Sequence, residues 1–366
     1  METLRFIVDA ERLAEPEAQS ALDTAAVILR GGGTVALPTE TVYGLGANAL
    51  DPVAVAKIFV AKQRPGWDPL IVHIADEPML ARIVNGNELP DSAQRLMKAF
   101  WPGPLTLLLP RSVAVPDAVT AGRALVGVRM PAHPVALELI RRAGVPIAAP
   151  SANSFGHTSP TTADHVLDDL DGRIDAVVDS GPTDFGVEST VINPCVSPMI
   201  IYRPGAITIE QIRAMAGPVE LFVERTDPEA ELAVGPREAL PSPGVGLRHY
   251  APRARLILVE GSDRELAALI DFQANSGERI GVMLPQGMGN EDVENLSRSK
   301  SVVIFPWGRW SRPDEMAHLL FAGLRHLDAV GCTVIVCPTP RGEGIAEAIR
   351  DRLRKAAYNT SPVPGI

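Results

Sequence analysis

Short apolar runs alternate with longer amphipathic stretches over the first 217 positions of the chain. Runs of four to six apolar residues are typical of buried strands, and amphipathic stretches of ten or more predict helices. Their alternation indicates an α/β fold. We expect strands at 34–37, 70–74, 105–109, 125–129, 147–149, 174–178, 190–192 and 199–202, and helices at 18–30, 52–62, 91–100, 134–143, 162–170 and 208–216.

The pattern breaks down between about 220 and 253, where proline, glycine and charged residues dominate. Such a composition predicts a linker. Beyond it, expected strands at 256–259, 280–284, 302–305 and 333–336 alternate with expected helices at 263–275, 313–327 and 344–357. This second series predicts a small doubly wound, Rossmann-like sheet. We therefore expect a larger α/β domain over residues 1–217, a linker over 218–254 and a small α/β domain over 255–366.

Composition narrows the class of ligand. The chain has 366 residues, of which 46% are hydrophobic and 21% charged, and its net charge is −10. These proportions are those of a globular protein and exclude a disordered one. An acidic chain does not attract nucleic acid or anionic membrane as a whole. Any polyanion must then bind in a local basic pocket, which favours a nucleotide-sized ligand.

The cysteines and the N-terminus predict a cytoplasmic location. Cys195, Cys332 and Cys337 are odd in number and lack the spacing of a zinc site, which fits a reducing compartment. The first residues carry acids and lack the apolar segment of a secretion signal. No apolar stretch approaches the roughly 20 residues that span a bilayer. We expect no membrane association.

Two segments near the first strands carry hydroxyls and cations. Residues 37–50, LPTETVYGLGANAL, place Thr41 and other hydroxyls directly after an expected strand, where ligands bind in open α/β sheets. Capping threonines in a tight turn are the alternative. Residues 61–74, AKQRPGWDPLIVHI, combine Lys62 and Arg64 at a helix end with His73 in an apolar strand. A solvated helix end and a core histidine are the alternative there.

Three later segments add anion-binding groups. Arg129 lies in an apolar strand, and a buried arginine needs an anionic partner. Residues 149–162, APSANSFGHTSPTT, supply many short hydrogen-bond donors after a strand, and Ser189 and Arg203 lie at the ends of two more. Together these side chains predict one concentrated anion pocket. The hallmark motifs of P-loop ATPases, Rossmann dehydrogenases, zincins and α/β-hydrolases are absent from the sequence.

The segments resemble, in order, the signature blocks of the L-threonylcarbamoyladenylate synthase (YrdC-like) family. The matching blocks are PTETVYGLG, AKQRP with DPLIVHI, WPGPLTLLL, VRMP, APSANSFGHTSPTT, GVESTV and YRPG, which span residues from about 20 to 205. SPGVGLRHYAP in the linker and the trailing α/β unit resemble the longer, two-domain form. The resemblance implies a twisted mixed α/β domain with a cationic cavity and a small Rossmann-like C-terminal domain.

The resemblance also implies residue roles. L-Threonine would be bound by Thr41, His73, Arg129, Ala149 (through its backbone) and Ser189. ATP would be bound by Lys62, Arg64, Asp68, Ser151, Asn153, Ser159, Arg203 and the linker residue Tyr250. No protein nucleophile is expected, and Mg²⁺ would arrive with ATP, without a tightly bound organic cofactor.

The sequence departs from the family pattern at three places. Asp68 stands where asparagine is more usual, Gln63 replaces the glycine of KGRP, and Val245-Gly246-Leu247 replaces a Met-Lys-Tyr-like run in the linker. A carboxylate near phosphates is unfavourable unless it helps hold Mg²⁺. The linker change puts a lysine contact in question.

The expected activity joins L-threonine, bicarbonate or CO₂ and ATP into L-threonylcarbamoyl-AMP and pyrophosphate. Its product would serve N6-threonylcarbamoylation of adenosine 37 in ANN-decoding tRNAs, through a threonylcarbamoyl transferase that acts on tRNA. Direct tRNA binding by this acidic chain is expected to be weak or absent. The alternatives are an RNA-binding module that uses the same cavity and an enzyme that handles carbamoyl-adenylate in metalloenzyme maturation.

Overall fold

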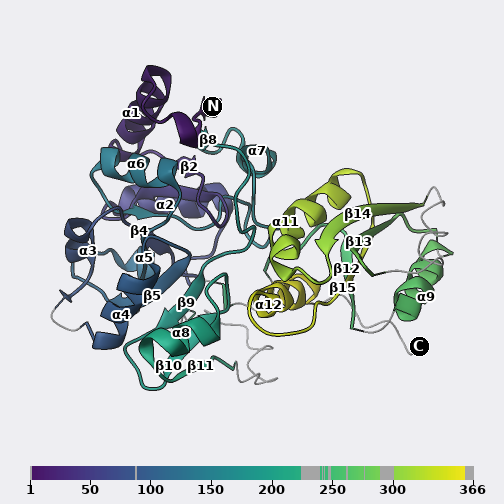
Figure 1. Cartoon of the computed structure of the whole chain (residues 1–366). Coiled ribbons are helices and arrows are strands. Elements are labelled where there is room, and N and C mark those ends of the chain that lie inside the picture. Colours follow the sequence, from purple (N-terminus) through teal and green to yellow (C-terminus); the bar gives the residue numbers. More distant parts are fainter. Residues whose placement is uncertain are drawn as a thin grey trace.

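The computed structural model describes residues 2–86, 89–223, 240, 242, 244–245, 249–260, 263–275, 277–288 and 301–358. Two α/β lobes lie side by side, and the chain passes from the larger N-terminal lobe to the smaller C-terminal one (Figure 1). Both expected α/β units are confirmed.

The larger lobe is built on a mixed sheet of eleven strands in the order β1-β8-β2-β3-β7-β4-β6-β5-β9-β10-β11. The sheet contains parallel pairs, such as β4 with β6, and antiparallel pairs, such as β5 with β6. The strands are β1 (Leu4–Ile7), β2 (Val35–Leu37), β3 (Gly44–Asn48), β4 (Ile71–His73), β5 (Leu105–Pro110), β6 (Leu125–Arg129), β7 (Ile147–Ala148), β8 (Ala176–Asp179), β9 (Thr190–Asn193), β10 (Met199–Arg203) and β11 (Val219–Leu221).

The helices of this lobe follow the sequence pattern closely. They are α1 (Pro16–Arg30), α2 (Pro52–Lys62), α3 (Glu77–Ile83), α4 (Asp91–Phe100), α5 (Asp117–Thr120), α6 (Pro134–Ala143), α7 (Ala163–Leu170) and α8 (Ile209–Ala216). Helices α2, α4 and α6 have the predicted bounds. Helix α2 begins where expected because the Asp51 carboxylate accepts a hydrogen bond from the Val53 amide and Pro52 occupies the first turn.

The pattern missed β1, β3, α3, α5 and β11. Strand β3 is rich in glycine and alanine, which have low β-propensity, and it forms because β2 and β7 pair with its two edges. Strand β11 lies inside the expected linker and pairs with β10, so the first sheet continues to Leu221.

The smaller lobe has a four-stranded parallel sheet in the order β12-β15-β13-β14. Its strands are β12 (Arg255–Val259), β13 (Ile280–Gln286), β14 (Val302–Arg309) and β15 (Val334–Pro338), and its helices are α9 (Asp263–Ala274), α11 (Pro313–Ala329) and α12 (Ile345–Ala357). Helix α9 covers one face, and α11 and α12 cover the other, which is turned toward the larger lobe (Figure 1).

The two lobes share a hydrophobic cluster. Val42 and Val187 of the larger lobe and Tyr250 of the linker pack with the core formed by α11 and α12. Gly186 makes the close approach possible: its φ is 69°, and a Cβ at this position would lie 2.4 Å from the carbonyl oxygen of His318 on α11. The interface is therefore packed like a domain core.

Candidate functional site

A single cavity collects the ends of several strands of the larger lobe and the end of the linker. Its lining includes residues within or just after β2, β4, β6, β7 and β10. Strands β4 and β6 bring His73 and Arg129 into direct register. Its lining residues are Thr39, Thr41, Val42, Gly44, Arg64, Pro69, Ile71, His73, Arg129, Ala149, Pro150, Ser151, Glu188, Ser189, Arg203, Gly244, His249 and Tyr250.

All five residues expected to hold threonine line this cavity. Arg129 donates to the hydroxyl oxygen of Thr41 at 2.8 Å and forms an ion pair with Glu40 at 2.7 Å between Nη2 and Oε1. Both side chains of the pair are less than 5% exposed. The anionic partner that a buried arginine requires is thus Glu40, a residue of the quoted 37–50 segment that we had not placed in the site.

Burial and the charge of Arg129 determine the pKa shifts of Glu40 and His73 in this part of the cavity. Burial alone would raise the pKa of Glu40, but the charge and hydrogen bond of Arg129 lower it below its usual value. Burial, with Arg129 as a second cause, lowers the pKa of His73 to about 3. Its imidazole is therefore neutral at physiological pH. Ser189 shares a hydrogen bond of 2.8 Å with the hydroxyl of Thr106.

Of the residues expected to hold ATP, Arg64, Ser151, Arg203 and Tyr250 line the cavity. Arg203 donates to the carbonyl oxygen of Ser189 from Nε and Nη2, at 3.1 and 3.0 Å. Burial and the charge of Glu188 raise the pKa of Tyr250 to about 12, so its phenol stays protonated.

Lys62, Asp68, Asn153 and Ser159 lie behind the cavity wall. Lys62 is buried and donates from Nζ to the carbonyl oxygens of Ser151, at 2.6 Å, and of Asn153. Burial, followed by the neighbouring charge of Arg64, lowers its pKa well below the usual value. In this structure Lys62 supports the loop that begins at Ser151.

Asp68 and Ser159 support other side chains of the wall. Asp68 forms a buried ion pair with Arg64 at 2.9 Å, and its Oδ2 lies 3.7 Å from Nε2 of His249 in the linker. Burial alone would raise the pKa of Asp68, and Arg64 lowers it. Ser159 donates to the carboxylate of Glu188. The unusual Asp68 thus has a cationic partner within the protein.

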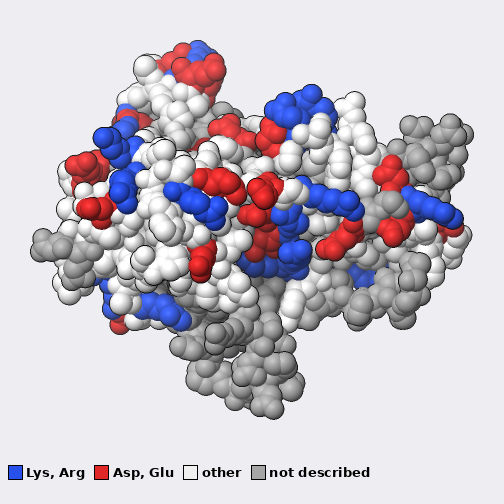
Figure 2. All heavy atoms as spheres, turned by 60° about the horizontal axis from the view of Figure 1, so that its bottom comes forward, with Lys and Arg blue, Asp and Glu red and all other residues white. Residues whose placement is uncertain are grey.

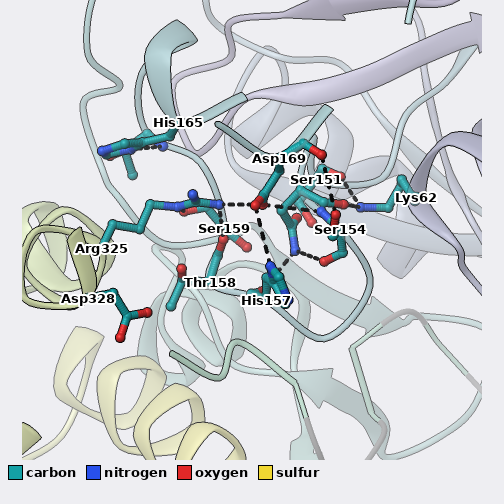
Figure 3. Close-up of polar contacts among 12 residues, drawn as sticks. Lys62, Ser151, Ser154, His157, Thr158, Ser159, His165, Asp169, Arg325 and Asp328 are labelled. Carbon is teal, nitrogen blue, oxygen red and sulfur yellow. Dashed lines mark hydrogen bonds and ion pairs between the residues drawn. The ribbon is translucent and has the colours of Figure 1, made fainter. Parts of the chain in front are cut away.

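The loop from Ser151 to Ser159 is also held from the second lobe (Figure 3). Asp169 of α7 accepts a hydrogen bond from the Ser154 amide at 3.2 Å and forms an ion pair with Arg325 of α11 at 2.8 Å. Arg325 donates to the Thr158 carbonyl oxygen at 2.5 Å as well. Burial alone would raise the pKa of Asp169, but its hydrogen bond with His157 and the charge of Arg325 lower it.

Sequence reasoning missed several residues of the site. Glu188 and His249 stand directly before Ser189 and Tyr250, which we had singled out, so their motifs carried a signal. Gly44 and Gly244 also line the cavity, but a glycine has no side-chain group that would mark it as a site residue in the sequence. The arginines of α11 and α12 gave no signal, because their partners lie more than 150 positions away in the chain.

Within the described ranges, no helix combines the length and apolar composition needed to cross a membrane. The same residues bring no three His, Cys, Asp or Glu side chains together as a possible metal site. On the face shown in Figure 2, basic and acidic side chains are interspersed over both lobes.

The larger lobe is a mixed α/β domain whose buried cavity offers arginines, hydroxyls and a neutral histidine. A small parallel α/β domain is joined to it. This combination defines a two-domain class of protein with a site suited to small polar and anionic ligands. Residues 27–205 match the family model described as "Telomere recombination", and residues 207–358 match the model "Threonylcarbamoyl-AMP synthase, C-terminal domain". The chain belongs to the two-domain threonylcarbamoyl-AMP synthase family.

Full-length relatives support this membership. The chain is 44% identical to a threonylcarbamoyl-AMP synthase of Bacillus subtilis, over 98% of both chains. It is 42% identical to one of Pyrococcus abyssi, over 91% of this chain and 93% of that protein. The crystal structure of P. abyssi Sua5 complexed with L-threonine superimposes with a TM-score of 0.84 at 40% identity, covering 97% of this chain and 98% of the other.

Proposed function

We propose that the protein joins L-threonine, bicarbonate or CO₂ and ATP into L-threonylcarbamoyl-AMP and pyrophosphate. The observation that carries this proposal is one cavity that holds Thr41, His73, Arg129, Ala149 and Ser189 beside Arg64, Ser151, Arg203 and Tyr250. An amino acid and a nucleotide bound together there would react without diffusing apart. The relatives' names and the threonine complex of P. abyssi Sua5 point to the same reaction.

The threonine end offers a carboxylate-binding group that is already oriented. Arg129 Nη2 forms an ion pair with Glu40, Nη1 donates to the Thr41 hydroxyl oxygen, and Nε donates to the Gly103 carbonyl oxygen at 3.2 Å. Such fixed geometry suits pairing with a carboxylate, which arginine binds well. His73, with a pKa of about 3, is a poor general base at neutral pH. We assign it hydrogen bonding to the substrate in its neutral form.

The chemistry needs no protein nucleophile. The neutral amine of threonine adds to the carbon of CO₂, forming a C–N bond and, after loss of a proton, a carbamate. A carbamate oxygen then attacks the α-phosphorus of ATP, and the bond to the β-phosphate oxygen breaks to release pyrophosphate. The protein contributes orientation and stabilises the developing negative charge.

Arg64 and Arg203 are the cationic side chains that we assign to the phosphates, with Mg²⁺ entering as part of the MgATP substrate. Ser151 would donate to a phosphate oxygen. The linker residues Gly244, His249 and Tyr250 line the same end of the cavity. We infer that this part of the linker excludes water from the adenylate, which hydrolysis would destroy.

The product is labile, so a second enzyme must take the threonylcarbamoyl group from it to adenosine 37 of tRNA. We propose that this protein works in the cytoplasm beside such a transferase and makes little direct contact with tRNA. The net charge of −10 and the interspersed charges in Figure 2 support weak attraction to a polyanion.

The test is pyrophosphate release with ATP, Mg²⁺ and bicarbonate in the presence of threonine, serine or valine, with the adenylate identified by mass. A site that hydrogen-bonds a hydroxyl rejects an analogue without it by about 10⁴-fold. We therefore expect valine to give almost no turnover and serine, which keeps the hydroxyl, to retain a measurable rate. Equal rates with valine and threonine would contradict the assigned pocket.

A further inference from the structure

A side chain from the second lobe lies behind one wall of the cavity and contacts residues that line it. Arg352 of α12 is 1% exposed and donates from Nε to Oε2 of Glu188 at 2.6 Å. It also donates from Nη2 to the carbonyl oxygen of Pro204 at 3.0 Å, next to Arg203. Its guanidinium carbon lies 5.1 Å from the centre of the Tyr250 ring. Arg352 also forms an ion pair with Asp351 on the same helix. It thus contacts the carboxylate of Glu188, the backbone beside Arg203 and the ring of Tyr250.

Glu188 is a buried carboxylate inside a site that must accept polyanionic phosphates. Its two oxygens have different partners, since Ser159 donates to Oε1 and Arg352 donates to Oε2. Burial alone would raise its pKa, but the charges of Arg352 and Arg203 lower it. Among the described residues, Arg203 forms no ion pair, and it donates to the carbonyl and hydroxyl oxygens of Ser189.

We propose that Arg352 is a positioning residue of the active site: it neutralises Glu188 and so keeps Arg203 available for the phosphates of ATP. This inference rests on the proposed function. It also gives the C-terminal lobe a specific part in the reaction, because the counter-ion of a carboxylate in the cavity comes from that lobe.

The physical reason is the competition between two arginines for one buried carboxylate. A buried charge without a partner is strongly destabilised. If Arg352 is removed, the other cation whose charge acts on Glu188 is Arg203, which donates to the carbonyl oxygen of the adjacent Ser189. Arg203 would then pair with Glu188 and would no longer be available for the phosphates.

The experiment compares Arg352→Gln with a control variant, Arg354→Gln, on the same helix. The Arg354 side chain is 66% exposed. Calorimetry measures the binding of a non-hydrolysable ATP analogue with Mg²⁺, and steady-state assays give KM for ATP and for threonine. Loss of a charged contact costs on the order of 10-fold or more in affinity. We expect Arg352→Gln to weaken ATP binding by about that factor and to change the threonine KM much less, while Arg354→Gln behaves as wild type.

The double variant Glu188→Gln, Arg352→Gln separates positioning from structure. A neutral amide does not compete for Arg203, so this variant should recover most of the lost ATP affinity. Unchanged ATP affinity in Arg352→Gln would overturn the proposal, and so would equal losses for ATP and threonine. If the single variant does not fold, the double variant decides: near wild-type affinity supports the proposal, and a loss of 10-fold or more overturns it.

The proposed function and this inference fail in different ways. Wild-type protein that binds the ATP analogue but releases no pyrophosphate with threonine and bicarbonate would contradict the proposed function. The calorimetric comparison of Arg352→Gln with Arg354→Gln would still test the role of Arg352.

Discussion

Gln63, the residue that follows helix α2, adopts a backbone conformation that positions Arg64 at the site. It follows α2 with φ 54° and ψ 38°, a left-handed conformation that glycine adopts at little cost. The turn lets the Arg64 amide donate to the Phe59 carbonyl oxygen at 3.0 Å and directs the chain back toward the cavity. Glycine, which the family resemblance implies at this position, would adopt this backbone without strain, whereas Gln63 carries the strain of a side chain there.

Gln63→Gly should therefore stabilise the protein slightly. Relief of left-handed strain gives about 1 kcal/mol, and the greater flexibility of glycine in the unfolded chain removes part of that gain. We expect a net increase of about 0.5 kcal/mol in the free energy of unfolding, measured by urea denaturation. Gln63→Ala keeps a Cβ and should give no increase. Equal gains in both variants would show that backbone strain is not the cause.

His73 makes the stability of the larger lobe depend on pH. Its pKa is about 3 in the folded protein against an ordinary value of 6.5, so the unfolded chain binds a proton that the folded protein does not. The stability that comes from keeping His73 neutral is fully present above pH 6.5 and is lost as the pH falls toward 3. Below pH 6.5 the unfolding free energy should fall less steeply in His73→Asn than in the wild type. The difference between the two slopes should be at most about 1.4 kcal/mol per pH unit. Parallel wild-type and variant curves between pH 7.5 and 4.5 would contradict it.

At the scale of elements, helix α11 acts on the loop from Ser151 to Ser159 without contacting the cavity. Arg325 joins that loop to Asp169, while Lys62 holds its first residues from the opposite side (Figure 3). The loop is irregular, and its carbonyl groups need such partners when buried. Its shape is therefore set by three elements from two lobes.

Arg325→Gln should weaken this arrangement strongly. Asp169 is 4% exposed and would lose its cationic partner, a change that costs roughly 3 kcal/mol. Thermal unfolding of the variant measures the loss. Arg312→Gln, at the exposed start of the same helix, should change stability by less than about 1 kcal/mol. Adding Asp169→Asn to Arg325→Gln should restore part of the stability, and no recovery would indicate that packing rather than charge is responsible.

At the scale of the whole molecule, the larger lobe has its own core but an incomplete site. Its sheet and helices enclose a hydrophobic cluster separate from the one shared with α11 and α12. Arg325 and Arg352, the partners of two of its buried carboxylates, belong to the second lobe. Separation of the lobes would leave Asp169 and Glu188 without these cations.

A chain ending after Val223 should therefore fold but lose most of its activity. We expect circular dichroism to show an ordered α/β domain and pyrophosphate release to fall by about 10²-fold or more, since linker and counter-ions are absent. Asp169→Asn with Glu188→Gln should raise the melting temperature of this shortened chain, because neutral groups need no cation. Full activity of the shortened chain would show that the second lobe is dispensable for catalysis.

The sequence by itself determined the kinds of elements and the chemical groups of the site. Helices α2, α4 and α6 were predicted with their bounds because capping residues and amphipathic periodicity are local properties. The quoted motifs supplied every side chain assigned to threonine, and all of these line the cavity.

Only the tertiary structure decided which charges meet. Glu40 pairs with Arg129, Arg352 reaches Glu188 across 164 positions, and Lys62 holds a loop without lining the cavity. Strand β3 likewise depends on pairing with β7, which is distant in the chain. Periodicity and motifs record what each residue can do next to its neighbours in sequence. Arg64 and Asp68, four positions apart, form a buried pair that is local in the sequence. The partners of Arg129 and Glu188 lie on distant elements and are decided by the packing of those elements, which local sequence does not encode.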